Sequence, residues 1–134
     1  MKKALSLAAV AILAFAGAAF AGDKYDVKVS PASGKSGGKA TAVVTVKAKG
    51  AYHVNLEYPH KLILKAPDGV TVEKAKLVAA DATKVSKEEL SFTVVATAAA
   101  PGKKTIEAEL KGAVCTDTTC EPFTETISIP VEAK

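Results

Sequence analysis

The chain has 134 residues, of which 49% are hydrophobic and 24% are charged, and its formal net charge is +4. Every basic residue is a lysine. Arginine supplies the planar guanidinium that grips phosphates and guanine edges, so its absence disfavours nucleic-acid binding. The lysines are instead typical of a solvated surface that keeps edge strands from aggregating, which favours a monomer.

The first 21 residues are predicted to be a secretory signal peptide. Two lysines precede a continuous run of apolar and small residues, and the run ends in AFA at positions 19–21, a small-x-small cleavage signature. A membrane anchor is the disfavoured alternative for this run. Cleavage leaves residues 22–134, which are enough for one domain with its own core.

We therefore expect an exported protein, periplasmic or secreted, in a compartment where disulfides persist. No segment after the signal is apolar for long enough to cross a bilayer. The mature chain is accordingly expected not to span a membrane.

Apolar residues after the signal recur mainly with a period of two, which is typical of half-buried β-strands. The candidate strands are rich in Val, Ile and Thr, and turns containing Gly and Pro separate them. Eight strands are expected, at residues 25–30, 41–49, 52–58, 61–66, 70–78, 90–98, 104–114 and 123–132. Short strands at this spacing, each with one apolar face, predict two antiparallel sheets packed as a sandwich.

Residues 79–90 interrupt the alternation. Ser86 is followed three residues later by Glu89, which is the spacing of a helix capping box, so one helical turn is a candidate here. A plain polar loop fits the same residues.

Cys115 and Cys120, the two cysteines of the chain, enclose the segment TDTT. If strands 104–114 and 123–132 are neighbours, TDTT is the loop of the hairpin that joins them. Directly opposed residues of an antiparallel pair have Cα atoms about 4.5 or 5.5 Å apart, and a disulfide can bridge either distance. The two cysteines are therefore candidates for a structural bond or a redox pair.

The loop that this bond would close is short. For about six residues the chain-entropy model gives roughly 2 kcal/mol, against more than about 4 kcal/mol for a loop of about sixty residues. A bond selected for stability would preferably reach further along the chain, although roughly 2 kcal/mol is still a useful fraction of a small domain's stability. Both interpretations stay open on the residues alone.

Few residues of the chain support metal binding or catalysis other than thiol chemistry. His53 and His60 lie some sixty residues upstream of the cysteines, and no second ligand pair completes a tetrahedral zinc site, so metal binding is disfavoured, although copper is not eliminated. The chain has no nucleophile–base motif, glycine-rich phosphate loop or evident carboxylate pair, and no cofactor is expected. Tyr52 and His53 are predicted to be ordinary strand residues.

The stretch KGAYHVNLEYPHKLILKAPDGVTVEKAKL, followed later by a strand ending in CTDTTCEPF, resembles the N-terminal periplasmic domain of the DsbD thiol-disulfide reductases. The similarity spans nearly the whole mature chain. The matching positions are Gly50, His53, Asn55, Pro59, Pro67, Gly69, Cys115, Cys120 and Pro122.

The resemblance implies an all-β fold, an immunoglobulin-like antiparallel β-sandwich of about seven to nine strands. It also implies that Cys115 and Cys120 shuttle between disulfide and dithiol. Electrons would arrive from a thioredoxin-like or membrane donor and leave toward periplasmic proteins through mixed disulfides, as in a protein-disulfide reductase component. Tyr52, Pro122 and Phe123 are then expected to line the site.

The surroundings of the cysteines qualify this role. Members of the family often place an aromatic cap loop over the disulfide, whereas residues 79–90 contain no aromatic side chain. Asp117 and Glu121 flank the sulfurs, and only Lys111 is a cation close in sequence, so a thiolate is not strongly favoured. We expect a disulfide that an activated partner thiol attacks. The alternative is a binding or structural sandwich in which the bond only fastens the last hairpin.

Overall fold

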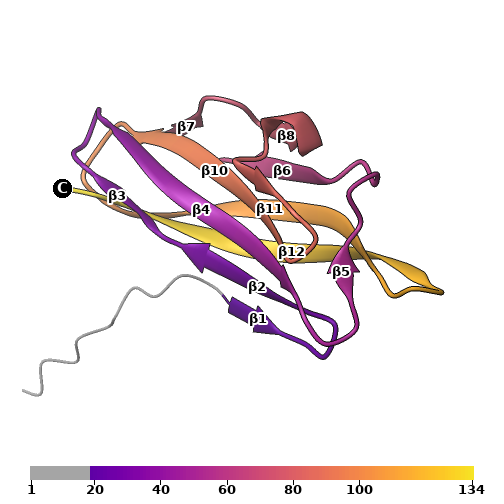
Figure 1. Ribbon diagram of the computed structural model, residues 1–134. Coiled ribbons are helices and arrows are strands. Elements are labelled where there is room, and N and C mark those ends of the chain that lie inside the picture. The colour runs from indigo at the N-terminus through magenta and orange to yellow at the C-terminus, as the bar shows by residue number, and fades with distance from the viewer. Residues whose placement is uncertain (1–18) are drawn as a thin grey trace, which may run out of the picture.

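The structure, a computed structural model, describes residues 19–134 and consists of two β-sheets packed face to face (Figure 1). The predicted signal peptide lies outside the described residues except for Ala19–Ala21, which form strand β1. Within residues 19–134 the chain forms no helix with the length and apolar character needed to cross a bilayer.

The first sheet has the strand order β1-β2-β4-β10-β7, with β9 also paired to β10, and its neighbouring strands are antiparallel. Its other strands are β2 (Tyr25–Ser30), β4 (Lys39–Ala48), β7 (Val70–Val72), β9 (Lys84–Val85) and β10 (Glu89–Ala98).

The second sheet has the order β3-β12-β11-β6-β8, with β5 also paired to β11. Its pairs are antiparallel except for β3 with β12, which run parallel. Its strands are β3 (Ala32–Gly34), β5 (His53–Val54), β6 (Lys61–Lys65), β8 (Lys76–Val78), β11 (Gly102–Cys115) and β12 (Cys120–Ala133).

Seven of these strands follow the order of an immunoglobulin-like sandwich. Strands β2, β4, β10 and β7 take the places of A, B, E and D, and β6, β11 and β12 take those of C, F and G. The predicted immunoglobulin-like sandwich is therefore confirmed. The further strands β1, β3, β5, β8 and β9 have only two or three residues each.

The core lies between the two sheets and follows directly from the period-two pattern. Val44 and Phe92 point inward from the first sheet, and Leu110 and Ile129 point inward from the second; all four are fully buried. Burying an aliphatic or aromatic side chain of this size contributes about 1.5–3 kcal/mol. This shared core fixes how the strands that carry the cysteines sit against the rest of the domain.

Two predicted strands are wrong in extent. Residues 52–58 form a strand only at His53–Val54, because the Asn55 side chain accepts the backbone N–H of Glu57 at 2.9 Å and turns the chain away from the sheet. Residues 70–78 divide between β7 and β8, which belong to different sheets. Val70 and Leu77 are both buried but are seven residues apart. Because side chains alternate between the two faces of a strand, residues at an odd spacing on one straight strand point to opposite faces, so the two cannot share a buried face on a single strand.

Residues 79–90 contain one helical turn, but not at the predicted capping pair. A single 3₁₀ turn (η1) spans Ala79–Asp81. Ser86 and Glu89 instead close the turn between β9 and β10: Ser86 N–H donates to Glu89 O at 2.8 Å, and Glu89 N–H donates to Ser86 Oγ at 3.2 Å. The side-chain bond expected of a helix cap thus serves a β-hairpin.

Candidate functional site

The two cysteines sit at the tip of the hairpin formed by β11 and β12. Figure 1 shows this hairpin, orange to yellow, projecting past the other strands at one end of the sandwich. Its register runs without interruption from Gly102 opposite Ala133 to Cys115 opposite Cys120. The Cα atoms of the two cysteines are 4.0 Å apart and a disulfide joins them.

The loop beyond the disulfide is held by Thr116. The Thr116 N–H donates to Thr119 O at 2.7 Å, and the Thr116 hydroxyl oxygen accepts the N–H of Thr119 at 3.1 Å. Asp117 and Thr118 are exposed at the extreme tip. The predicted TDTT loop is therefore a tight, hydrogen-bonded turn.

The two cysteines differ in exposure. Cys115 is only 4% exposed, whereas Cys120 is exposed. Cys115 alternates with Val114, which faces the core, so the disulfide lies on the outer face of the sheet. A foreign thiol approaching the hairpin meets Cys120 first.

Strand β5 brings a distant segment against Cys115. His53 is the register partner of Cys115, and Val54 is that of Val114. Such opposed residues have Cβ atoms about 4.5–5.5 Å apart. His53 is therefore close to Cys115 in space, although some sixty residues lie between them in the sequence. Within residues 19–134 no three His, Cys, Asp or Glu side chains are grouped so as to hold a metal ion.

Asn55 contacts the sulfur of Cys120, and His60 in turn contacts Asn55. The Asn55 side-chain nitrogen Nδ2 lies 3.9 Å from Cys120 Sγ, and His60 Nε2 donates to the Asn55 carbonyl oxygen at 2.6 Å. His60 is 1% exposed, and this burial lowers its pKa below the ordinary histidine value. Asn55 is one of the positions that match the DsbD family, so the sequence pointed to this residue. No feature of the sequence pointed to a role for His60 beside it.

An ion pair flanks the disulfide on the side of β12. Lys24 Nζ lies 2.7 Å from Glu121 Oε2. This lysine, together with a hydrogen bond from Tyr52, lowers the pKa of the Glu121 carboxyl. Lys111, the one cation close to the cysteines in sequence, pairs with Glu109, whereas Lys24, far away in sequence, offsets the charge of Glu121.

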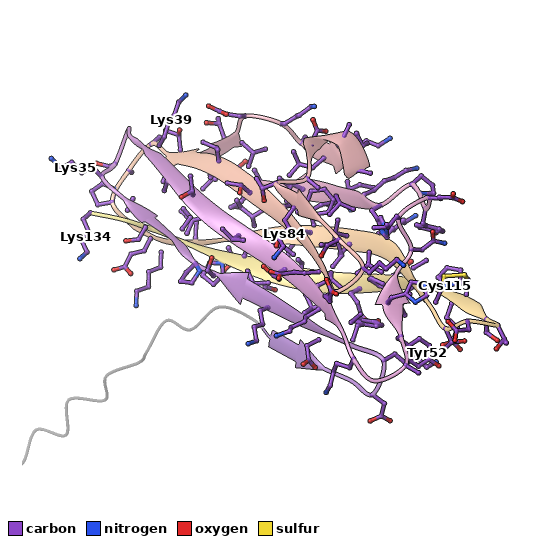
Figure 2. All side chains as sticks on the ribbon, in the orientation of Figure 1. Lys35, Lys39, Tyr52, Lys84, Cys115 and Lys134 are labelled. Carbon is purple, nitrogen blue, oxygen red and sulfur yellow. A yellow bond between two sulfur atoms is a disulfide. The ribbon has the colours of Figure 1, made fainter. Side chains whose placement is uncertain are left out.

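The three residues expected to line the site lie in different surroundings. Tyr52 is at the same end of the molecule as the disulfide, as Figure 2 shows, and Lys24 lies 5.9 Å from its ring centre. Pro122 is exposed on β12, opposite Ala113. Phe123 turns to the interior, where its ring stacks on Tyr25 with centres 4.2 Å apart.

A cavity of about 270 Å³ lies beside this part of β12. Glu121, Pro122 and Phe123 line one side of it, and residues 22–25 line the other. The hydroxyl of Tyr25 donates to Glu125, and burial raises the pKa of Tyr25. These contacts tie the first sheet to the strand that carries Cys120.

Comparisons with known proteins give no family for this chain. No family model and no curated protein sequence matches it. Similar solved structures include the N-terminal periplasmic domain of ScsB from Proteus mirabilis, with a TM-score of 0.49 and 10% identity over 84% of this chain and 50% of that one. The chain thus spans about half the length of that structure.

Two other structures are similar at the same level. The yeast GGA1 GAE domain has a TM-score of 0.47 and 15% identity, covering 83% of this chain and 96% of that one. AggA, the major subunit of aggregative adherence fimbriae type I from Escherichia coli, has a TM-score of 0.42 and 10% identity, covering 85% and 98%. At these scores the three structures carry no weight for function.

We predict that Gly112→Ala destabilises the protein by about 1–3 kcal/mol, because overpacking at a close contact forces its neighbours to move. A Cβ atom at Gly112 would lie 2.6 Å from the Phe123 ring and 2.9 Å from His60 Nδ1. The midpoint of urea unfolding measures the loss. Thr126→Ala, on the exposed side of β12, is the control and should stay within about 0.5 kcal/mol; equal midpoints would contradict the packing described.

The lowered pKa of His60 predicts a loss of stability in acid. The unfolded chain, with an ordinary histidine pKa near 6.5, binds a proton at His60 more readily than the folded chain does. The stability that the neutral, buried His60 contributes is therefore full above about pH 6.5 and decreases as the pH falls below it. Urea midpoints at pH 7.5 and 5.5 measure the effect. His60→Gln, which keeps a donor without the titration, should lose less on the same change; an equal loss in both proteins would show that His60 is not responsible.

Proposed function

We propose that the chain is an exported thiol-disulfide exchange module, in which Cys115 and Cys120 pass reducing equivalents between a thioredoxin-like or membrane donor and proteins of the same compartment. The observation that carries this proposal is the unequal exposure of one disulfide: Cys120 is open to solvent and Cys115 is buried behind it. The resemblance of the CTDTTCEPF segment to the DsbD family supports the same role.

The exchange follows from this geometry. A thiolate of the donor attacks Cys120 Sγ, the bond to Cys115 breaks, and Cys115 leaves as a thiolate that takes up a proton. The second thiol of the donor then attacks the mixed disulfide and frees Cys120, so that two electrons have moved from donor to module. The reverse sequence, started by Cys120 on the disulfide of an acceptor, passes the electrons on.

The β11–β12 ladder suits a pair that opens and closes repeatedly. Cys115 and Cys120 are register partners at the end of a continuous ladder, and their Cα atoms are 4.0 Å apart with the bond formed. The backbone pairing alone keeps such opposed residues about 4.5 or 5.5 Å apart, within the range that a disulfide bridges. After reduction the two thiols therefore stay opposed, and the strands need no rearrangement for the bond to form again.

The electrostatics favour a partner that supplies the nucleophile. Asp117 is exposed beside the sulfurs, and the charge of Glu121 is offset by Lys24. Without a cation directed at either sulfur among the contacts described, neither thiol is strongly activated. The module is then an electron relay whose disulfide is attacked by a thiolate that its partner has already activated.

A structural bond is the second candidate. The burial of Cys115 favours it, because a shielded sulfur is harder to reduce. In that case the disulfide only fastens the last hairpin, and the protein is a non-catalytic binding or structural sandwich. The reduction potential distinguishes the two.

For a relay we predict a midpoint potential of about −180 to −270 mV, within reach of thioredoxin-like partners. Equilibration with glutathione or dithiothreitol buffers, followed by alkylation of free thiols, measures it. A potential below about −300 mV would identify a structural bond and reject the relay.

Single cysteine variants test which sulfur exchanges. Cys115→Ala leaves the exposed Cys120 thiol, and the matched variant Cys120→Ala leaves the buried one. We predict that Cys120 reacts with a small aromatic disulfide on the order of tenfold faster than Cys115, and that only Cys120 traps a thioredoxin-like protein as a mixed disulfide. Equal rates, or a faster Cys115, would contradict the proposed order of attack.

A further inference from the structure

Asn55 places a hydrogen-bond donor against the sulfur that faces solvent. Its Nδ2 lies 3.9 Å from Cys120 Sγ, across a sequence separation of 65 residues. Sulfur is a weak acceptor in a disulfide but becomes a full negative charge in a thiolate. A donor at this point therefore has most effect when Cys120 is released from its bond.

The orientation of the Asn55 amide is determined by its other contacts. Its oxygen Oδ1 accepts the backbone N–H of Glu57 at 2.9 Å, which leaves the NH₂ group to face Cys120. Its own backbone N–H donates to Ala113 O at 3.0 Å and so fastens the residue to the cysteine strand. The amide thus reaches the sulfur from a residue that is already fixed to the strand carrying Cys115.

The buried His60 bonds to the backbone of Asn55. Its Nε2 donates to the Asn55 carbonyl oxygen at 2.6 Å, so Nε2 carries a proton. Burial lowers the pKa of His60, which favours the neutral ring. The ring fits beside Gly112 and Phe123, where a Cβ atom at Gly112 would come within 2.9 Å of Nδ1. The missing Cβ at Gly112 thus leaves room for this ring in the interior.

We propose that the Asn55 amide is a catalytic group that hydrogen-bonds the Cys120 sulfur and stabilises its thiolate, and that His60 is the residue that positions it. In the exchange, Cys120 carries negative charge when the donor releases it and again when it attacks an acceptor disulfide. The role in exchange rests on the proposed function, whereas the hydrogen bond concerns only the Cys120 thiol and can be tested without a partner.

The test measures the pKa of Cys120 in the Cys115→Ala background, from the pH dependence of alkylation by iodoacetamide. A lost donor to a thiolate raises its pKa, so Asn55→Ala should raise it by about half to one unit. Asn55→Asp should raise it further, because the carboxylate still accepts the Glu57 N–H but loses the donor and adds a negative charge. Leu56→Ala, at the exposed neighbouring residue, is the control and should cause no shift.

The role of His60 is tested by a second pair of variants in the same background. His60→Leu fills similar space but cannot donate to Asn55, so the pKa of Cys120 should move toward the Asn55→Ala value. His60→Gln can still donate and should restore much of the original pKa. In the Asn55→Ala background, His60→Leu should add nothing further, since both changes remove the same contact.

An unchanged or lowered pKa in either Asn55 variant overturns the proposal, with folding checked by circular dichroism. If the Asn55 variants shift the pKa but His60→Leu does not, the positioning role of His60 is overturned. These outcomes are independent of the test of the proposed function. A reduction potential typical of a structural bond would reject the relay without affecting the pKa shift of Cys120, and a potential typical of a relay would not require that shift.

Discussion

The disulfide depends on one constraint, the continuous antiparallel register of β11 and β12. The ladder is fixed at its base by buried residues such as Ile106 and Ile129, which are opposite one another in the core. Because side chains alternate strictly along a strand, this register decides both that Cys115 opposes Cys120 and that the pair lies on the outer face. A slip of one residue would remove the bond and turn the core residues outward together.

The end of the sandwich beyond the core is organised around that pair. Strand β5 fastens itself to β11 beside Cys115, and its Val54 N–H also donates to Lys87 O at 2.7 Å, which links it to the turn before β10. On the other flank, Lys24, directly before β2, binds Glu121 of β12, and Tyr25 of β2 binds Glu125. Both sheets thus support the base of a projecting hairpin and leave its tip free, an arrangement compatible with contact between Cys120 and a second protein.

The sequence was sufficient for whatever depends on alternation along one strand. The hairpin, its TDTT loop and the two-sheet sandwich could all be predicted in this way, whereas contacts between distant strands could not. His53 and Asn55 reach the cysteines, and Lys24 reaches Glu121 beside them, through strand pairing and sheet packing, about which the local sequence pattern carries no information. The same limit explains the error at 70–78. The odd spacing of the buried residues there reflects the passage of the chain from one sheet to the other, but the sequence pattern resembles that of one continuous strand.

The central claim is that the bond opens in the folded protein, by attack on the sulfur of Cys120. The most direct measurement is the rate of its reduction by increasing concentrations of dithiothreitol under native conditions, compared with the rate of global unfolding. Our account predicts a rate that rises in proportion to thiol concentration and exceeds the unfolding rate, while the circular dichroism spectrum stays that of the β-sandwich. A rate that is independent of thiol concentration and equal to the unfolding rate would show that the sulfur is reached only when the fold is lost, and would contradict the account.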